Sequence, residues 1–161
     1  MTQTILSAEL CAKIDEWVKR YPPDRKASGI LQALHYAQEA HGGSLNDDIL
    51  NAVADYLGMP RTLVYEIATF YTMYHLKPMG KHVISVCNSI SCWLSGSEDM
   101  LHHLKDRLKI EIGETTGDKK FSLREVECLG ACADAPMCRV NKEYRGNLTQ
   151  EKIDQMLSEL E

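Results

Sequence analysis

The chain has 161 residues, 44% of them hydrophobic and 25% charged, which is the balance of a folded globular protein with one domain or two small ones. Its net charge is −5 with both signs mixed along the sequence, which argues against nucleic-acid binding because a surface that follows phosphates is basic. The sequence has no run of about 18 apolar residues that could insert in a membrane, and its N-terminus has neither signal-peptide nor transit-peptide character, so we expect a cytoplasmic protein.

The first half of the chain is predicted to be helical. Its apolar residues recur with a period near 3.6. Ser and Asn are typical N-caps, Pro and Gly end helices, and Pro also suits a first helical turn. The expected starts and ends are, in chain order, Ser7 and Pro22, Ile30 and His41, Asn46 and Gly58, and Pro60 and Tyr71.

A helix-turn-helix is conceivable over residues 49–71, where a Gly turn separates two of these helices. However, residues 1–80 carry seven Lys or Arg against nine Asp or Glu. A DNA-binding surface should be basic, so we expect these apolar helices to dock a partner chain instead.

The pattern changes at the Lys-Pro-Met-Gly segment, residues 77–80. Runs rich in β-branched residues and a new helical period then predict a small α/β domain. Its expected elements are a strand over 81–87, a helix capped by Ser97, a strand over 119–128, a short strand over 137–141, a turn over 145–147 and a helix capped by Thr149. We therefore predict a helical domain over residues 1–78 and an α/β domain over residues 79–161.

Four cysteines form two tight pairs, CNSISC at 87–92 and CLGAC at 128–132, separated by 35 residues. Four thiolates select zinc or an iron–sulfur cluster, and the inner gaps of four and three residues are wider than the usual zinc C-x2-C. A loop of this length can direct backbone N–H groups toward a thiolate and a bridging sulfide. Each pair follows a predicted strand, so neighbouring strands would bring the two pairs together at one sheet edge. The pattern favours an iron–sulfur cluster.

Several alternatives stay open at this stage. The cysteines could be buried apolar side chains, a zinc clip or a redox dithiol, although no thioredoxin C-x-x-C is present. Two disulfides conflict with a cytoplasmic location. Cys138 could compete as a ligand but lies inside a predicted strand, and Cys11 shares a helix face with core residues. Trp93, next to Cys92, is expected to shield the site from water.

Taken together, the motifs resemble the family of E subunits of NADH-quinone oxidoreductase, respiratory complex I. The resemblance rests on CNSISC followed by CLGACADAPM, on ATFYTMYHLKPMGKH before the first strand, and on NLTQEKIDQMLSEL at the end. It covers nearly the whole chain. It implies an N-terminal helical bundle followed by a thioredoxin-like ferredoxin domain with one 2Fe–2S cluster, whose ligands would be Cys87, Cys92, Cys128 and Cys132. Cys138 departs from the family pattern, where an apolar residue is expected.

The resemblance also implies partners. The flavin-bearing F subunit would bind FMN and NADH. This agrees with the lack of a G-x-G-x-x-G or P-loop motif in this chain. The F subunit would also connect this chain to the other peripheral-arm subunits at the inner face of the cell membrane. The chain would move single electrons and would not turn over alone. The alternative is the equivalent diaphorase subunit of an NAD-linked hydrogenase or formate dehydrogenase, which one chain cannot distinguish.

Overall fold

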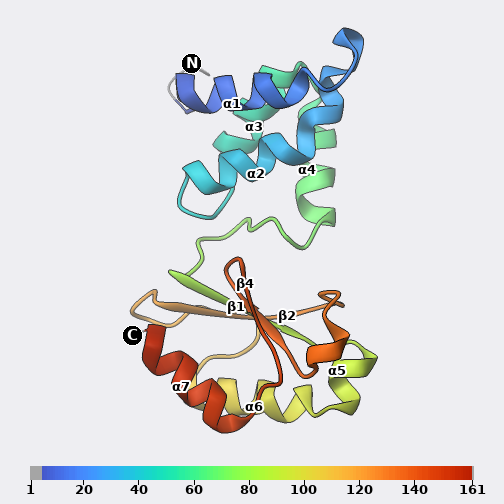
Figure 1. The fold of residues 1–161 in the computed structure, drawn as a ribbon. Helices are drawn as coiled ribbons and strands as arrows, with labels where there is room; N and C mark the ends of the chain where they lie inside the picture. The colour runs from blue at the N-terminus through green and yellow to red at the C-terminus, as the bar shows by residue number, and fades with distance from the viewer. Residues whose placement is uncertain (1–4, 161) are drawn as a thin grey trace. The chain divides into compact units, whose positions relative to one another are not determined.

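The computed structural model describes residues 5–160 of the chain. Its Cα positions cluster into two compact units, Met1–Pro78 and Met79–Glu161, coloured blue to green and green to red in Figure 1. The first unit is built from helices, and the second combines helices with a four-stranded sheet. This architecture confirms the predicted α/β fold class. None of the helices in the described part of the chain has both the length and the apolar character needed to span a bilayer.

The N-terminal unit follows the predicted caps closely. Ser7 Oγ accepts a hydrogen bond from Leu10 N at 3.2 Å, and Asn46 Oδ1 accepts one from Ile49 N at 2.9 Å. Gly58 adopts a left-handed conformation with φ 67° and ends its helix. The elements are α1 Ala8–Val18, the 3-10 helix η2 Pro23–Gly29, α2 Ile30–Ala40, α3 Asp47–Leu57 and α4 Arg61–Phe70. Only η2 was not predicted. Its prolines were interpreted as the end of the preceding helix, although a proline also suits the first turn of a new helix.

The Asn46 cap supplies the first testable prediction. We expect Asn46→Ala to lower the free energy of unfolding by about 1 kcal/mol, because the Ile49 N–H then loses its acceptor. Urea denaturation followed by far-UV circular dichroism measures this change. Asn46→Asp keeps an acceptor oxygen and should stay near wild type. Equal losses in both variants would contradict a capping role.

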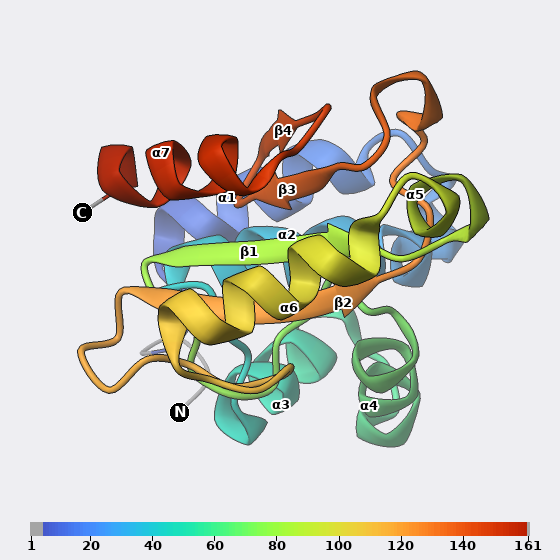
Figure 2. The ribbon, with the colours of Figure 1, turned by 90° about the horizontal axis from the view of Figure 1, so that it is seen from below.

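The C-terminal unit holds a mixed sheet with the strand order β2-β1-β3-β4. Strands β1 and β2 are parallel, and the two other pairings are antiparallel. Figures 1 and 2 show α6 and α7 together on one face of this sheet. The elements are β1 His82–Cys87, α5 Ile90–Leu94, α6 Ser97–Leu108, β2 Phe121–Val126, the 3-10 helix η3 Cys132–Asp134, β3 Cys138–Val140, β4 Glu143–Arg145 and α7 Gln150–Leu160.

Several details of this unit differ from the predictions, among them the unpredicted 3-10 helix η3. The short helix α5 occupies the expected C-x4-C loop, and β2 ends at Val126 rather than at Cys128. Strand β4 was not predicted, because its three residues are too few to show an alternating pattern. It begins two residues before the predicted turn. Ser97 is the first residue of α6 rather than its cap, and its hydroxyl donates to Asn88 Oδ1 at 2.8 Å. The cap at Thr149 is confirmed by its hydrogen bond from Lys152 N.

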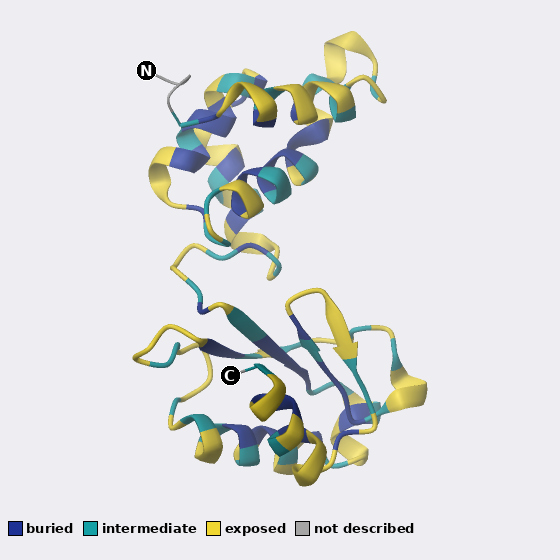
Figure 3. Cartoon of the chain, turned by 60° about the vertical axis from the view of Figure 1, so that its left-hand side comes forward, coloured by how far each residue is buried: buried dark blue, intermediate teal, exposed yellow. Residues whose placement is uncertain are grey.

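The C-terminal unit contains two separate apolar clusters. The larger one joins sheet residues such as Ile84 and Leu123 to Leu104 of α6 and Ile153 of α7. The smaller one contains Cys87, Cys92 and Met137, with parts of the loop after β2 packed against it. Figure 3 shows the buried residues along the strands and on the inward faces of the helices. The smaller cluster gathers residues from β1, α5 and the segment before β3, and Leu129 and Ala131, from the segment that carries Cys128 and Cys132, pack against it.

Candidate metal centre

The first cysteine pair lies on regular structure. Cys87 is the last residue of β1, and Cys92 lies in the middle of α5. Both side chains are only 2% exposed. Since Cys87 belongs to a strand and Cys92 to the helix that follows it in the chain, regular backbone structure fixes where both side chains begin.

The second pair lies outside regular strands. Cys128 follows the end of β2 by two residues, and Cys132 is the first residue of η3. Both residues are exposed, and their Sγ atoms are 3.8 Å apart. We call residues 127–137, which carry this pair, the second cysteine loop.

Parallel pairing of β1 with β2 brings the two pairs to one end of the sheet, as the sequence predicts. The register sets Cys87 opposite Val126, and Asn88 N donates to the Val126 carbonyl at 3.2 Å. Ser89 Oγ also donates to Glu127 Oε2 at 3.3 Å. The two cysteine segments therefore run side by side.

Backbone N–H groups point at the thiols from both segments. Burial by itself raises the pKa of the Cys87 thiol, but hydrogen bonds with the Ser89 and Leu129 N–H groups, the Cys92 thiol and the Ser89 hydroxyl together outweigh it, so the pKa of Cys87 lies below its ordinary value. Gly130 N donates to Cys128 Sγ at 3.4 Å. Such donors stabilise a sulfur that carries negative charge.

Cys92 has the opposite electrostatic character. Burial raises the pKa of its thiol, and its hydrogen bond with Cys87 raises it further. Negative charge on Cys132 also raises the pKa of Cys92, so cysteines of both pairs influence this thiol. A positive charge, such as an iron ion, would be needed to keep both buried sulfurs ionised.

The two remaining cysteines do not join this group. Cys138 on β3 is fully buried in the larger apolar cluster, and burial raises the pKa of its thiol to about 12. Cys11 packs against the core of the N-terminal unit, as predicted. Trp93 is 53% exposed while the neighbouring Cys92 is 2% exposed, so the shielding role of Trp93 stays a prediction.

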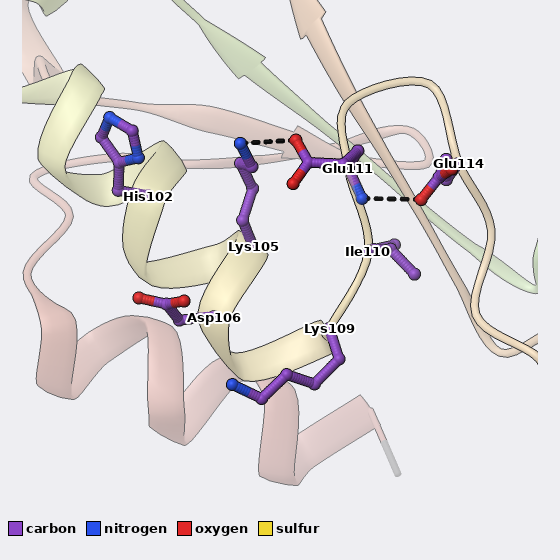
Figure 4. A pocket seen from close by; sticks show the side chains of 7 residues that line it. All are labelled: His102, Lys105, Asp106, Lys109, Ile110, Glu111 and Glu114. Atoms are coloured by element: carbon purple, nitrogen blue, oxygen red, sulfur yellow. Dashed lines mark hydrogen bonds and ion pairs between the residues drawn. The ribbon is translucent and has the colours of Figure 1, made fainter.

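A pocket on the C-terminal unit lies on a different element. It has a volume of about 390 Å³ and is formed by α6 and the loop that follows it (Figure 4). Lys105 Nζ pairs with Glu111 Oε2 at 2.5 Å, and Glu111 N donates to Glu114 Oε2 at 2.8 Å. These charges tie the loop to the helix, and we assign the pocket no ligand.

The donor set fits an iron–sulfur cluster. A 2Fe–2S cluster has two thiolate ligands on each of two irons, and the chain supplies two cysteine pairs, a partly apolar surrounding and N–H donors to sulfur. Among residues 5–160, no three His, Cys, Asp or Glu side chains lie close enough together to hold a metal ion in this geometry, so the set of four ligands stays a prediction.

Comparison with protein families gives the class. A family model described as thioredoxin-like 2Fe–2S ferredoxin matches residues 14–161. The fold and the paired thiols agree with this match, so the chain is a ferredoxin of the thioredoxin-like 2Fe–2S class.

Individual relatives identify the family within this class of ferredoxins. The E subunit of NADH-quinone oxidoreductase from Rickettsia bellii is 46% identical over 146 residues, 91% of this chain and 87% of the relative. An E subunit of the same enzyme from Rhizobium meliloti, distinguished there by the number 2, is 46% identical over 145 residues, 90% and 84% of the two chains. The chain therefore belongs to the family of NADH-quinone oxidoreductase E subunits, whose members are parts of an oxidoreductase complex.

A solved structure shows the same fold at lower identity. The air-oxidised NAD+-reducing NiFe hydrogenase matches with a TM-score of 0.71 and 21% identity. The match covers 82% of this chain and 22% of the hydrogenase chain. At this identity the likeness extends to the fold alone.

Proposed function

We propose that Cys87, Cys92, Cys128 and Cys132 hold one 2Fe–2S cluster and that the chain transfers single electrons within NADH-quinone oxidoreductase. The observation that carries this proposal is that the two cysteine segments lie side by side at one end of the β1–β2 pairing, with Leu129 and Ala131 packed against Cys87 and Cys92. When bound, the cluster accepts and releases one electron at a time. We also propose that the two compact units are separate domains, with boundaries at residues 78 and 79.

The residues of the chain have distinct tasks in this proposal. Strand β1 and helix α5 fix the buried pair in apolar surroundings that limit access of water. The N–H groups of Ser89, Leu129 and Gly130 stabilise negative charge on sulfur. Burial and hydrogen bonds are the levers by which a protein sets the potential of such a cluster.

An exposed apolar patch beside the cysteines supports a protein partner. Ile90, Trp93 and Leu94 of α5 are 74%, 53% and 73% exposed. These positions share one side of a helix, and exposed apolar patches of this kind mark interaction sites. We call these three residues the α5 patch. The cysteines that it adjoins would then lie at the contact with an electron-transfer partner.

We propose that this partner is the flavin-bearing F subunit, which would bind FMN and NADH. A flavin takes two electrons together from NADH as a hydride and can release them singly to a one-electron centre. Exposed acids near the α5 patch, Glu125 and Glu127, favour a partner surface with basic residues at its rim. Through the F subunit the chain would join the other peripheral-arm subunits, on the cytoplasmic side of the cell membrane.

The diaphorase subunit of an NAD-linked hydrogenase or formate dehydrogenase remains the second candidate. The fold of the NAD+-reducing hydrogenase agrees with it. Six relatives that are 43–46% identical carry the NADH-quinone oxidoreductase name, which favours the first proposal.

The first test of the proposal is anaerobic analysis of iron and acid-labile sulfide, with EPR after dithionite reduction. We expect about two irons and two sulfides per chain and a signal from the reduced cluster. The same sample should not oxidise NADH with a soluble acceptor. Zinc without sulfide would contradict the electron-transfer function, and NADH turnover by the pure chain would contradict the division of tasks with the F subunit.

A further inference from the structure

The second cysteine loop presents a physical problem. Its thiols are exposed and lie on neither a strand nor an α-helix, yet a metal cluster requires ligands held at defined positions. Within the loop, only short-range hydrogen bonds are present among the described residues, such as Asp134 N to the Ala131 carbonyl at 3.0 Å. Contacts from another segment must therefore hold it.

The Ser89 hydroxyl and the backbone of Cys87 hold the two ends of the loop, at Glu127 and Met137, and strand β4 and the residues after it hold its middle. Tyr144 Oη donates to the Leu129 carbonyl at 3.0 Å. Asn147 N donates to the Asp134 carbonyl at 2.6 Å, and Asn147 Nδ2 donates to Asp134 Oδ1 at 3.2 Å. One contact falls between Cys128 and Cys132, directly after Cys128, and the others fall two residues after Cys132, so they fix the loop within the pair and beyond it.

Gly146 allows this segment to come close. A Cβ at Gly146 would lie 2.5 Å from Asp134 Cβ and 2.9 Å from the Asp134 carbonyl oxygen, both shorter than atoms tolerate. The turn at residues 145–147 is thus fitted against the loop at Asp134. Its glycine is required by close approach rather than by an unusual backbone angle.

The Tyr144 contact acts on a single peptide unit. The carbonyl of Leu129 and the N–H of Gly130 belong to the same planar peptide. Tyr144 holds the carbonyl end, and the N–H end donates to Cys128 Sγ at 3.4 Å. Fixing the carbonyl therefore also fixes the direction of the N–H toward the sulfur.

We propose that Tyr144 is a positioning residue that aims the Gly130 N–H at the Cys128 sulfur, and that Tyr144, Gly146 and Asn147 together clamp the second cysteine loop. This inference rests on the proposed function, since it concerns how the chain holds its cluster. An added electron makes the cluster more negative, so an N–H donor stabilises the reduced form more than the oxidised form. Weakening the donor should lower the reduction potential.

The test of the Tyr144 role is a redox titration of the cluster in Tyr144→Phe, followed by EPR on the full chain. We expect the one-electron equilibrium to shift toward the oxidised form by up to about tenfold, which is a fall of up to about 59 mV. Tyr56→Phe is the control, because Tyr56 Oη also donates to a backbone carbonyl, that of Cys11 in the N-terminal unit. It should leave the potential unchanged.

The outcomes separate this inference from the proposed function. A wild-type chain without iron and sulfide would defeat the function itself. A wild-type chain with a cluster, together with an unchanged or raised potential in Tyr144→Phe, would overturn the positioning role while leaving the function intact.

A second variant tests the clamp through retention of iron. Gly146→Ala should release iron several times faster than wild type in the presence of a chelator, because the added methyl group displaces Asp134. Gly117→Ala is the matched control in the same unit, since nothing lies within 4 Å of a Cβ there and its φ is not positive. Equal release from both variants would refute the clamp.

Discussion

Replacing Cys92 or Cys128 by Ser should remove most of the iron and sulfide from the purified chain. A hydroxyl is a much poorer ligand for iron than a soft thiolate. In addition, the hydroxyl introduced by Cys92→Ser would be buried beside Cys87 and Met137 with few polar partners. The iron and sulfide content per chain and the EPR signal measure the loss. The two variants sample one buried and one exposed thiol, so a common loss would show that both pairs contribute ligands.

Cys138→Ala is the control for this experiment. The Cys138 thiol is fully buried among apolar residues of the sheet, and its raised pKa opposes ionisation. We expect this variant to keep its iron while becoming less stable, because removing a buried sulfur leaves a small cavity. Loss of the cluster in Cys138→Ala, with retention in Cys132→Ala, would show that the ligand set is wrong.

A double variant of the α5 patch, Ile90→Ser with Leu94→Ser, should weaken binding to the proposed partner, the purified flavin-bearing F subunit, by about 30-fold or more. This corresponds to the loss of about 2 kcal/mol that central apolar contacts of an interface commonly contribute. Isothermal titration calorimetry measures the affinity. Trp93 lies between the two altered positions and keeps its place, so the change removes apolar area and leaves the helix itself in place.

Two controls make this result specific. Ile112→Ser also replaces an exposed apolar side chain of the C-terminal unit, 42% exposed and on the loop after α6, and should bind like wild type. Iron content must be unchanged in all variants, because α5 also carries Cys92. Unchanged affinity of the double variant would exclude the α5 patch as the docking surface.

The two cysteine pairs are held in physically different ways. Cys87 and Cys92 take their positions from a strand and a helix, and their surroundings are apolar. Cys128 and Cys132 take theirs from a loop that depends on hydrogen bonds to Tyr144 and Asn147. The exposed pair should therefore respond more strongly to substitutions in the neighbouring strand β4.

The sequence alone determined most of the secondary structure. Helical periodicity with Ser7, Asn46 and Gly58 as caps located the N-terminal helices, because capping depends on hydrogen bonds within a few residues of chain. The spacing of the cysteine pairs indicated an iron–sulfur ligand set, since thiolate chemistry and loop length are local properties as well. The family match agrees with that indication.

The tertiary structure decided what depends on distant residues. Helix α5 and strand β4 are too short to show a hydrophobic period in the sequence. Their contacts with α6 and β3 stabilise them instead. The side-by-side placement of the two cysteine segments needed the parallel register of β1 with β2. Three further features depend on which chain segments meet in space, and no sequence pattern predicts them. They are the exposure of Trp93, the complete burial of Cys138 and the hydrogen bond from Tyr144 to Leu129.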